Sequence, residues 1–220
     1  MAIEHRPESV PSVAEGTNDI PRLYPILDAS CFAEDRALLQ FAEDLLSAGL
    51  TLLQYRNKHG SPRQMLSQAR QLRQIAGERV RWIMNDRADL CLAAGFDGVH
   101  VGQDDLPPEA VRRIVEKPLW VGVSTHNPEQ LRRADQTDAD YLAIGPVFAT
   151  SSKANPDPMV GLEGVRAARA LTRKPLVAIG GITRSNARSV IEAGADAVAV
   201  ISDLLQDPRR AVAEFQRLLS

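Results

Sequence analysis

The sequence predicts an α/β fold, a single (β/α)8 barrel of the TIM type. Eight short apolar runs rich in Val, Ile and Leu recur along the 220 residues, as expected for parallel strands that are buried on both faces. Segments with helical spacing and charged outer positions lie between them. A small polar cluster ends almost every run. All strands of a parallel barrel point the same way, so these clusters are expected to meet at one face, where barrel enzymes build their active sites.

The apolar runs define the expected strands. In chain order they are Leu23–Leu27, Leu50–Leu53, Val80–Met84, Gly98–Val101, Leu119–Val123, Tyr141–Ile144, Leu176–Ile179 and Ala197–Ile201. Strand alternating with helix eight times indicates a barrel. An open doubly wound sheet is the alternative, because counting runs does not prove closure. The eight even repeats favour the barrel.

The segments between the runs predict the helices. Clear helical spacing is found in Asp35–Ala48, Arg63–Ala76, Pro108–Val115, Pro128–Ala134, Leu162–Leu171, Ser185–Ala193 and Pro208–Leu218, and Arg87–Ala94 is shorter and less regular. No linker divides the chain, so residues 23–220 are expected to form one catalytic domain. Residues 1–22 are expected to be a flexible N-terminal extension.

Charge and composition exclude several classes of protein. The formal net charge is -2 and the Arg residues are spread along the helices, so nucleic acid is not an expected partner. The N-terminus lacks the apolar core of a signal peptide and no run is long enough to span a membrane. We therefore expect a cytoplasmic protein. Cys31 and Cys91 lack CxxC spacing and are expected to be ordinary reduced residues.

Two carboxylates follow the third and fourth strands. Asp86 and Asp105 are placed to approach each other across one rim of the barrel. Two carboxylates with open positions suit Mg²⁺ bound to substrate phosphates. The alternative is that each aspartate caps the helix that follows it.

Three polar residues alternate along the end of the second strand. Period-two geometry directs Gln54, Arg56 and Lys58 to the same side. A guanidinium fork and a point charge there would hold a diphosphate. Solvated loop residues are the alternative, but three on one face beside a carboxylate pair favour a binding site.

An anion site is expected after the last strands. Gly180-Gly181 ends the seventh strand and Ser202 follows the eighth, which is the usual barrel site for a phosphate monoester. A tight turn is the alternative for the glycine pair. The segment from Gly145 to Lys153, with three consecutive hydroxyls and a lysine, is suited to close over a phosphorylated ligand, although a flexible polar loop has the same composition.

Six motifs in register resemble those of the thiamine-phosphate synthase family. They are Gln54-Tyr55-Arg56-Asn57-Lys58, Asn85-Asp86, His100-Val101-Gly102-Gln103-Asp104-Asp105, Gly122-Val123-Ser124-Thr125-His126, Gly145-Pro146-Val147-Phe148-Ala149-Thr150-Ser151-Ser152-Lys153 and Ile179-Gly180-Gly181-Ile182. The similarity runs from about Leu23 to Leu219. Tyr55 stands where the family often has an aliphatic residue, and Ser152 where it often has threonine.

The resemblance implies a reaction and a site. The enzyme would join 4-amino-2-methyl-5-(diphosphooxymethyl)pyrimidine to a thiazole phosphate carboxylate or its tautomer, releasing diphosphate. Arg56, Lys58, Ser124 and Lys153 would be catalytic, and Asp86 and Asp105 would hold Mg²⁺. The substrate-binding residues that the resemblance implies are Gln54, Tyr55, Arg56, Asn57, Lys58, Asn85, Ser124, Thr150, Ser151, Ser152, Lys153, Gly181, Ile201 and Ser202.

Two other functions remain open. One is a thiazole tautomerase or regulator of the same fold, in which His126 would shuttle a proton. Such an enzyme has no use for Asp105, Lys58 and Lys153 together, and their joint presence favours the synthase. The other is a non-catalytic barrel that senses a phosphorylated ligand, since fold alone does not establish turnover. Coupling at a ring nitrogen needs no general base, so His100 and His126 are expected to be structural or to shape the substrate site.

Overall fold

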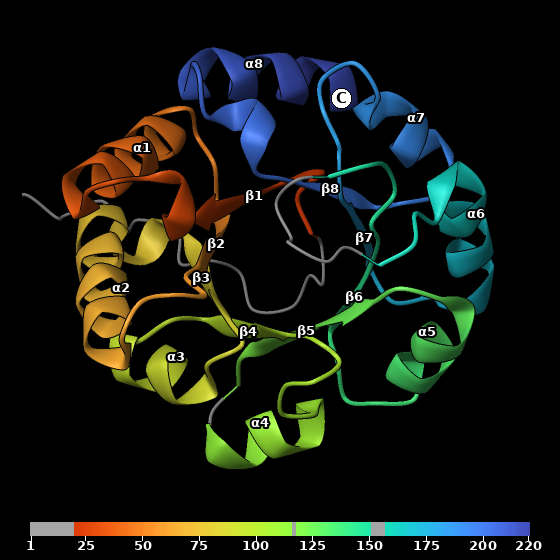
Figure 1. Ribbon diagram of the computed structural model, residues 1–220, viewed down its shortest axis with the longest axis horizontal. Helices are drawn as coiled ribbons and strands as arrows, with labels where there is room; N and C mark the ends of the chain where they lie inside the picture. The colour runs from red at the N-terminus through yellow and green to blue at the C-terminus, as the bar shows by residue number, and fades with distance from the viewer. Residues whose placement is uncertain (1–19, 116–117, 151–156) are drawn as a thin grey trace, which may run out of the picture.

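The computed structural model describes residues 20–115, 118–150 and 157–220, and it shows a closed barrel of eight parallel strands (Figure 1). β1 pairs with β8 as well as with β2, with Leu23 opposite Val198 and Ile26 opposite Gln54. The predicted barrel is thus confirmed. The strands are β1 (Leu23–Asp28), β2 (Leu52–Arg56), β3 (Arg81–Asn85), β4 (Gly98–Val101), β5 (Trp120–Thr125), β6 (Tyr141–Ile144), β7 (Leu176–Ile179) and β8 (Ala197–Val200).

The helices form a ring around the barrel (Figure 1). Several begin where a side chain accepts a backbone N–H and proline occupies the first turn, as at Ser61, Asn127 and Asp207. They are α1 (Asp35–Ser47), α2 (Pro62–Ala76), α3 (Ala88–Ala94), α4 (Pro108–Ile114), α5 (Pro128–Asp135), α6 (Gly161–Leu171), α7 (Ala187–Glu192) and α8 (Pro208–Leu219). In the described residues, three short 3-10 turns lie between a strand and a helix: η1 (Ala29–Cys31), η2 (Gly77–Arg79) and η3 (Ser202–Leu204).

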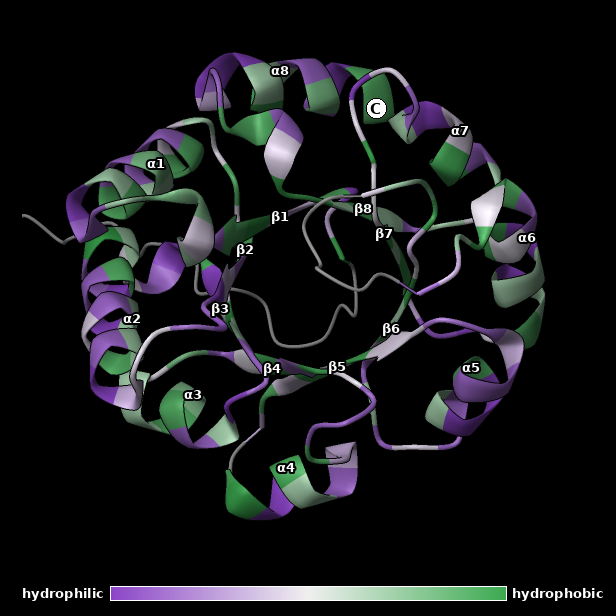
Figure 2. Cartoon of the chain, in the orientation of Figure 1, coloured by the Kyte–Doolittle hydropathy of each residue, from purple (hydrophilic) through white to green (hydrophobic). Residues whose placement is uncertain are grey.

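The alternation of side chains along each strand divides the core in two. Outward residues such as Leu53 and Trp82 pack against the helices in the larger cluster, and inward residues such as Ile26 and Ile83 fill the barrel. Figure 2 shows hydrophobic and hydrophilic bands together on the helices, as amphipathic helices require. Inward positions near the carboxyl ends of β2, β4 and β5 are polar, namely Gln54, His100 and Ser124, and they line the open end of the barrel.

A repeated aspartate closes the opposite end of the barrel. Asp97, Asp140 and Asp196 each stand one residue before an even-numbered strand and accept a backbone N–H from the preceding strand, at 2.8, 2.7 and 2.7 Å respectively. Each also pairs with an arginine of the helix ring: Arg73, Arg112 and Arg169 respectively. These contacts fasten the amino-terminal ends of β3 to β8, the end of a barrel whose contacts serve stability.

The structure differs from the prediction at a few boundaries. β2 begins two residues later than expected and continues through Arg56, because its polar residues point into the open end of the barrel. Ile20, inside the predicted extension, is buried with the inner cluster, and residues 1–19 lie outside the described part of the chain. In the described ranges, no helix is both long and apolar enough to cross a membrane.

Candidate active site

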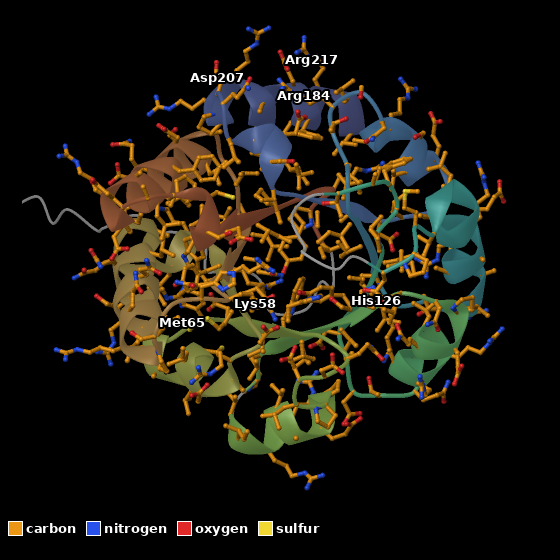
Figure 3. The ribbon with its side chains drawn as sticks, viewed as in Figure 1. Lys58, Met65, His126, Arg184, Asp207 and Arg217 are labelled. Atoms are coloured by element: carbon orange, nitrogen blue, oxygen red, sulfur yellow. The ribbon has the colours of Figure 1, made fainter. Side chains whose placement is uncertain are left out.

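A pocket of about 560 Å³ opens at the carboxyl ends of the strands. Figure 3 shows labelled Lys58 and His126 over the barrel, with Met65 out on α2. The polar clusters that end different strands therefore meet at one face, as the sequence predicted. Among its lining residues are Gln54, Arg56, Lys58, Asn85, Asp86, Asp105, Ser124, Thr150, Gly181, Ile201 and Ser202.

The floor of this pocket is a chain of buried hydrogen bonds. Gln54 Nε2 donates to the Tyr24 hydroxyl at 3.0 Å, and the hydroxyls of Tyr24 and Tyr141 are 2.8 Å apart. The Tyr141 hydroxyl lies 3.0 Å from Nδ1 of His100, whose Nε2 lies 2.8 Å from Ser124 Oγ. These residues occupy inward positions on five different strands. The chain thus connects the β2 side of the pocket to the β5 side.

A glycine on β5 makes room for this chain. A Cβ at Gly122 would lie 2.1 Å from Cζ of Tyr141 and 2.5 Å from Nδ1 of His100. Any larger residue there would displace both rings, since real Cβ contacts do not approach so closely. Gly122 is therefore a requirement of the polar floor.

Burial keeps the floor uncharged. Desolvation raises the pKa of Tyr24 and Tyr141, and it lowers the pKa of His100 to about 4. A neutral imidazole has one donor and one acceptor nitrogen. Because the Gln54 amide donates to Tyr24, the Tyr24 hydroxyl donates to Tyr141, and the Tyr141 hydroxyl donates to Nδ1 of His100. The proton of the neutral His100 ring is therefore on Nε2, which donates to Ser124 Oγ. This order leaves the hydroxyl hydrogen of Ser124 for a ligand.

Two cations at the end of β2 are paired with carboxylates. The Arg56 guanidinium contacts Asp28 at the end of β1, and the Lys58 ammonium contacts Asp86. Asp28 is itself fixed by hydrogen bonds from the backbone N–H and hydroxyl of Ser30. The two cations are thereby held at the pocket wall, and they present donors to an anion in the pocket.

The two aspartates predicted to hold a metal do not cap helices. α3 is preceded by Arg87 and α4 by Pro107, and neither helix has a side-chain cap. Asp86 adopts φ 62°, which few residues other than glycine tolerate, while its N–H donates to the His100 carbonyl at 2.7 Å. Oδ2 of Asp105 accepts the Gly102 N–H at 2.8 Å. Strain at Asp86 fits a functional position.

The charges and oxygen donors around Asp86 and Asp105 suit Mg²⁺. Burial raises the pKa of Asp86, Lys58 opposes this, and the adjacent Asp105 carboxyl adds to it. A divalent cation between these two carboxylates would remove the repulsion between their negative charges. No group of three acidic, His or Cys side chains able to hold a metal occurs in the described ranges. Mg²⁺ commonly takes one or two carboxylates and completes its shell with phosphate oxygens and water, so these oxygen donors fit it.

Asn85 has an unsatisfied amide in the same wall. Its Nδ2 is buried and, in the part of the chain that the structure describes, has no hydrogen-bond partner. A buried unpaired donor costs about 1–3 kcal/mol. A ligand with an acceptor oxygen at this point would remove that cost.

The opposite side of the pocket is built from backbone. Gly180 and Gly181 have φ 100° and 63°, and a Cβ at Gly181 would lie 2.4 Å from the Ala149 carbonyl oxygen. The turn after β7 therefore packs directly on the loop after β6. Ile201 and Ser202 line the pocket beside it. Together these elements form a cup on this side of the pocket, at the usual barrel phosphate position.

Some predicted residues lie elsewhere. Tyr55 is buried behind β2, where its hydroxyl bonds to Gln68 of α2 and its ring meets Phe96. Strand alternation turns it away from the pocket, so a substrate contact by its side chain is not supported. Asn57 also faces Gln68 and accepts the Gly60 N–H at 2.7 Å, so it shapes the loop. Ser151, Ser152 and Lys153 lie outside the described residues.

His126 is held by its neighbours. Nδ1 lies 2.6 Å from the Gly145 carbonyl oxygen and therefore donates to it, while Nε2 lies 3.5 Å from Asp157. This arrangement fixes the ring between the loops after β5 and β6. It supports the expected structural role.

Sequence reasoning missed several residues of the site. Tyr24 and Gln130 line the pocket, and Tyr141 and Asp28 support it. The inward alternation of β1 and β6 was a usable signal for both tyrosines, since Tyr24 shares a face with Ile26. No pattern marked Gln130, which reaches the pocket from α5 while accepting the His126 N–H at 2.7 Å.

Comparison with known proteins identifies the family. Residues 23–204 match the family described as Thiamine monophosphate synthase. The chain belongs to the thiamine-phosphate synthase family. A thiamine-phosphate synthase of Koribacter versatilis is 61% identical over 203 residues, which cover 91% of this chain and 96% of the relative. One from Chloroflexus aurantiacus is 42% identical over 202 residues, covering 90% of this chain and 93% of that relative.

A solved structure agrees with the family. Thiamine phosphate pyrophosphorylase from Pyrococcus furiosus superposes with a TM-score of 0.79 and 32% identity, covering 90% of this chain and 95% of that one. The barrel and its order of elements are thus those of a thiamine-phosphate synthase. The matched residues 23–204 include every sequence motif that ends in the pocket.

Proposed function

We propose that the described pocket couples a pyrimidine diphosphate to a thiazole phosphate with the help of Mg²⁺. Family membership makes the chain a thiamine-phosphate synthase, a transferase of thiamine biosynthesis. The reaction breaks the C–O bond of the pyrimidine methylene, and the electron pair leaves with diphosphate. The thiazole nitrogen then forms the new C–N bond. Thiamine phosphate and diphosphate are the products. Because both precursors are phosphorylated metabolites, we also propose a cytoplasmic location.

The diphosphate half of the site is assigned to the β2 to β4 side. Arg56 and Lys58 supply positive charge at the wall, and Asn85 offers its unpaired amide. Asp86 and Asp105 would hold Mg²⁺, which when bound would neutralise charge on the diphosphate oxygens. Charge placed where the leaving group becomes negative lowers the barrier to its departure.

The pyrimidine is assigned to the polar floor. Gln54 and Ser124 lie at opposite ends of the buried chain and both line the pocket. Ser124, with its lone pair engaged by His100, donates to an acceptor on the substrate. His100 is neutral and buried at neutral pH, so the floor orients the ring without adding charge beside the reacting carbon.

The thiazole phosphate is assigned to the opposite cup. Gly181 offers a backbone N–H, and Ser202 and Thr150 offer hydroxyls beside Ile201. Roles for Ser151, Ser152 and Lys153 rest on the family motif alone. Lys153 is proposed to act on the departing diphosphate, so Lys153→Ala should slow single-turnover coupling more than it weakens thiazole phosphate binding.

The observation that supports the proposal is that two differently built sets of polar groups suited to anions line one pocket. A cationic wall with a carboxylate pair lies on one side, and a neutral backbone cup lies on the other. This matches one substrate that carries a metal-bound diphosphate and another that carries a phosphate monoester. A tautomerase acting on the thiazole alone would need only the cup.

Incubation with both phosphorylated precursors and Mg²⁺ tests this function. Thiamine phosphate and diphosphate should form in equal amounts, and EDTA should stop the reaction until Mg²⁺ is restored. Asp105→Asn should raise the Mg²⁺ concentration needed for half-maximal activity or abolish turnover. Asp89→Asn, at an exposed pair with Arg87, is the matched control. Full activity in metal-free buffer would remove Mg²⁺ from the proposal, and absence of product with folded protein would refute coupling.

A further inference from the structure

Arg184 links the two loops that form the phosphate cup. It follows β7 in the turn that begins with Gly180, and Figure 3 shows it beside α8. Its backbone N–H donates to Oδ2 of Asp203 at 2.8 Å, and its Nε donates to the same oxygen at 2.9 Å. Its Nη2 lies 3.3 Å from Oδ1 of Asp203. The guanidinium therefore grips one carboxylate with two nitrogens.

The same side chain reaches a third element. Nη1 of Arg184 donates to Oε2 of Glu214 in α8 at 2.5 Å. Oε1 of Glu214 accepts from Arg210 at 2.8 Å, so the carboxylate is held from its own helix. Arg184 thus ties the turn after β7 to η3 and fastens both to α8.

Both ends of this link are adjacent to the cup. Asp203 directly follows Ser202 in η3. On the other side, Asn186 donates to the Gly181 carbonyl at 3.0 Å and accepts the Thr183 N–H at 2.8 Å, which makes the turn from 181 to 186 a rigid unit. The Arg184–Asp203 contact therefore joins the two segments that carry the Gly181 N–H and the Ser202 hydroxyl.

The exposure of this network argues for a positional role. The side chains of Arg184, Asp203 and Glu214 are 33%, 19% and 24% exposed, and ion pairs at such sites add little to stability. The planar fork nevertheless fixes direction as well as distance, which a lysine does not do. An arginine used in this way holds two loops in register at small energetic gain to the fold.

We propose that Arg184 is a positioning residue for the thiazole phosphate. By joining the turn after β7 to η3, it holds the backbone N–H of Gly181 and the hydroxyl of Ser202 at the separation that one phosphate requires. This inference rests on the proposed function of the cup. It adds a residue that lies outside the pocket lining and acts through Asp203.

The test compares Arg184→Ala with Arg210→Ala. Both remove a cation from Glu214, but only the first removes the guanidinium contacts to Asp203, which then keeps only its bond from the backbone N–H of residue 184. Arg184→Ala should raise the KM for thiazole phosphate roughly tenfold, equivalent to about 1.4 kcal/mol, with kcat and the KM for the pyrimidine diphosphate nearly unchanged. Arg184→Lys should recover only part of the loss. Arg210→Ala should resemble the wild-type protein.

Two further measurements keep the outcome decisive. Asp203→Asn should reproduce the effect, and the double variant Arg184→Ala/Asp203→Asn should be no worse than either single variant. Calorimetric titration with thiazole phosphate alone should show the same weakening, even if the wild-type protein proves unable to couple. Equal changes in both KM values, or equal effects of Arg184→Ala and Arg210→Ala, would overturn the positioning role. If Arg184→Ala does not fold, an unchanged thiazole phosphate affinity in Asp203→Asn would also overturn it.

Discussion

Burial of His100 makes the stability of the fold depend on pH in a calculable way. Its folded pKa is about 4, against an ordinary value of 6.5. Below pH 6.5 the unfolded chain binds a proton that the folded protein does not bind, so stability is complete above that pH and declines toward pH 4. Each unit by which the pH falls within this window lowers the free energy of unfolding by about 1.4 kcal/mol. Lowering the pH from about 7 to about 5 should therefore cost about 2 kcal/mol through His100.

A matched pair of unfolding curves isolates this contribution. Urea unfolding of the wild-type protein and of His100→Asn, followed by circular dichroism in EDTA at both pH values, should show a larger loss in the wild-type protein. Other ionisable groups, including Asp86 and Lys58, are common to both proteins and largely cancel in the difference. Equal losses in the two proteins would refute the argument. So would an NMR titration in which the His100 ring is protonated at pH 5.

Four other predictions follow from contacts in the structure. His126→Ala should retain substantial coupling activity, because its imidazole holds Gly145 and Asp157; complete loss in a folded variant would indicate a catalytic histidine. Gly181→Val should raise the KM for thiazole phosphate more than that for the pyrimidine diphosphate, since its Cβ would strike the loop after β6, and equal increases would show that the turn shapes the whole rim. Tyr141→Phe removes the hydroxyl that fixes the tautomer of His100 and, through it, the orientation of Ser124. It should lower kcat/KM for the pyrimidine diphosphate about 2–10-fold, the loss expected from one hydrogen bond worth about 0.5–1.5 kcal/mol. Unchanged kinetics would contradict the proposed chain of hydrogen bonds. Asp196→Ala should cost about 1–3 kcal/mol in urea unfolding by leaving the Leu176 N–H unpaired, and a loss no larger than that of Asp89→Ala at its exposed pair would contradict the proposed fastening.

Most strands could be predicted because a strand buried on both faces is an unbroken apolar run that is easy to delimit in the sequence. Runs such as Tyr141–Ile144 and Leu176–Ile179 are apolar throughout, and the observed β6 and β7 have the predicted bounds. The apolar run Leu50–Leu53 does not reach the end of β2 because Gln54 and Arg56 are polar, although their alternation already placed them along the end of this strand. They belong to the strand because inward positions near the mouth of the barrel face a ligand instead of the core. α7 begins at Ala187, later than predicted, because Asn186 is used to close the preceding turn.

Strand alternation correctly predicted which side chains of the second strand face the pocket, whereas the motif taken as a block did not. Gln54, Arg56 and Lys58 reach the pocket as their spacing predicted. Tyr55 and Asn57 share the motif but point to α2. Tyr24 and Tyr141 were overlooked because they were counted as apolar strand residues, although their hydroxyls hold the floor together. No sequence pattern marked Arg184 as part of the site, because its partners Asp203 and Glu214 are distant in the sequence.

The division of the core into two clusters gives the chain a separate optical reporter in each. The sequence has two tryptophans. Trp82 stacks on Phe96 between the sheet and the helices, with ring centroids 5.5 Å apart. Trp120 lies within the barrel, where its ring is 6.1 Å from that of Tyr141 and the Arg81 guanidinium is 3.7 Å from its centroid. Fluorescence of Trp82→Phe would thus report only from inside the barrel, and that of Trp120→Phe only from beneath the helices. Loosening of one layer before the other would be visible as two emission changes at different urea concentrations.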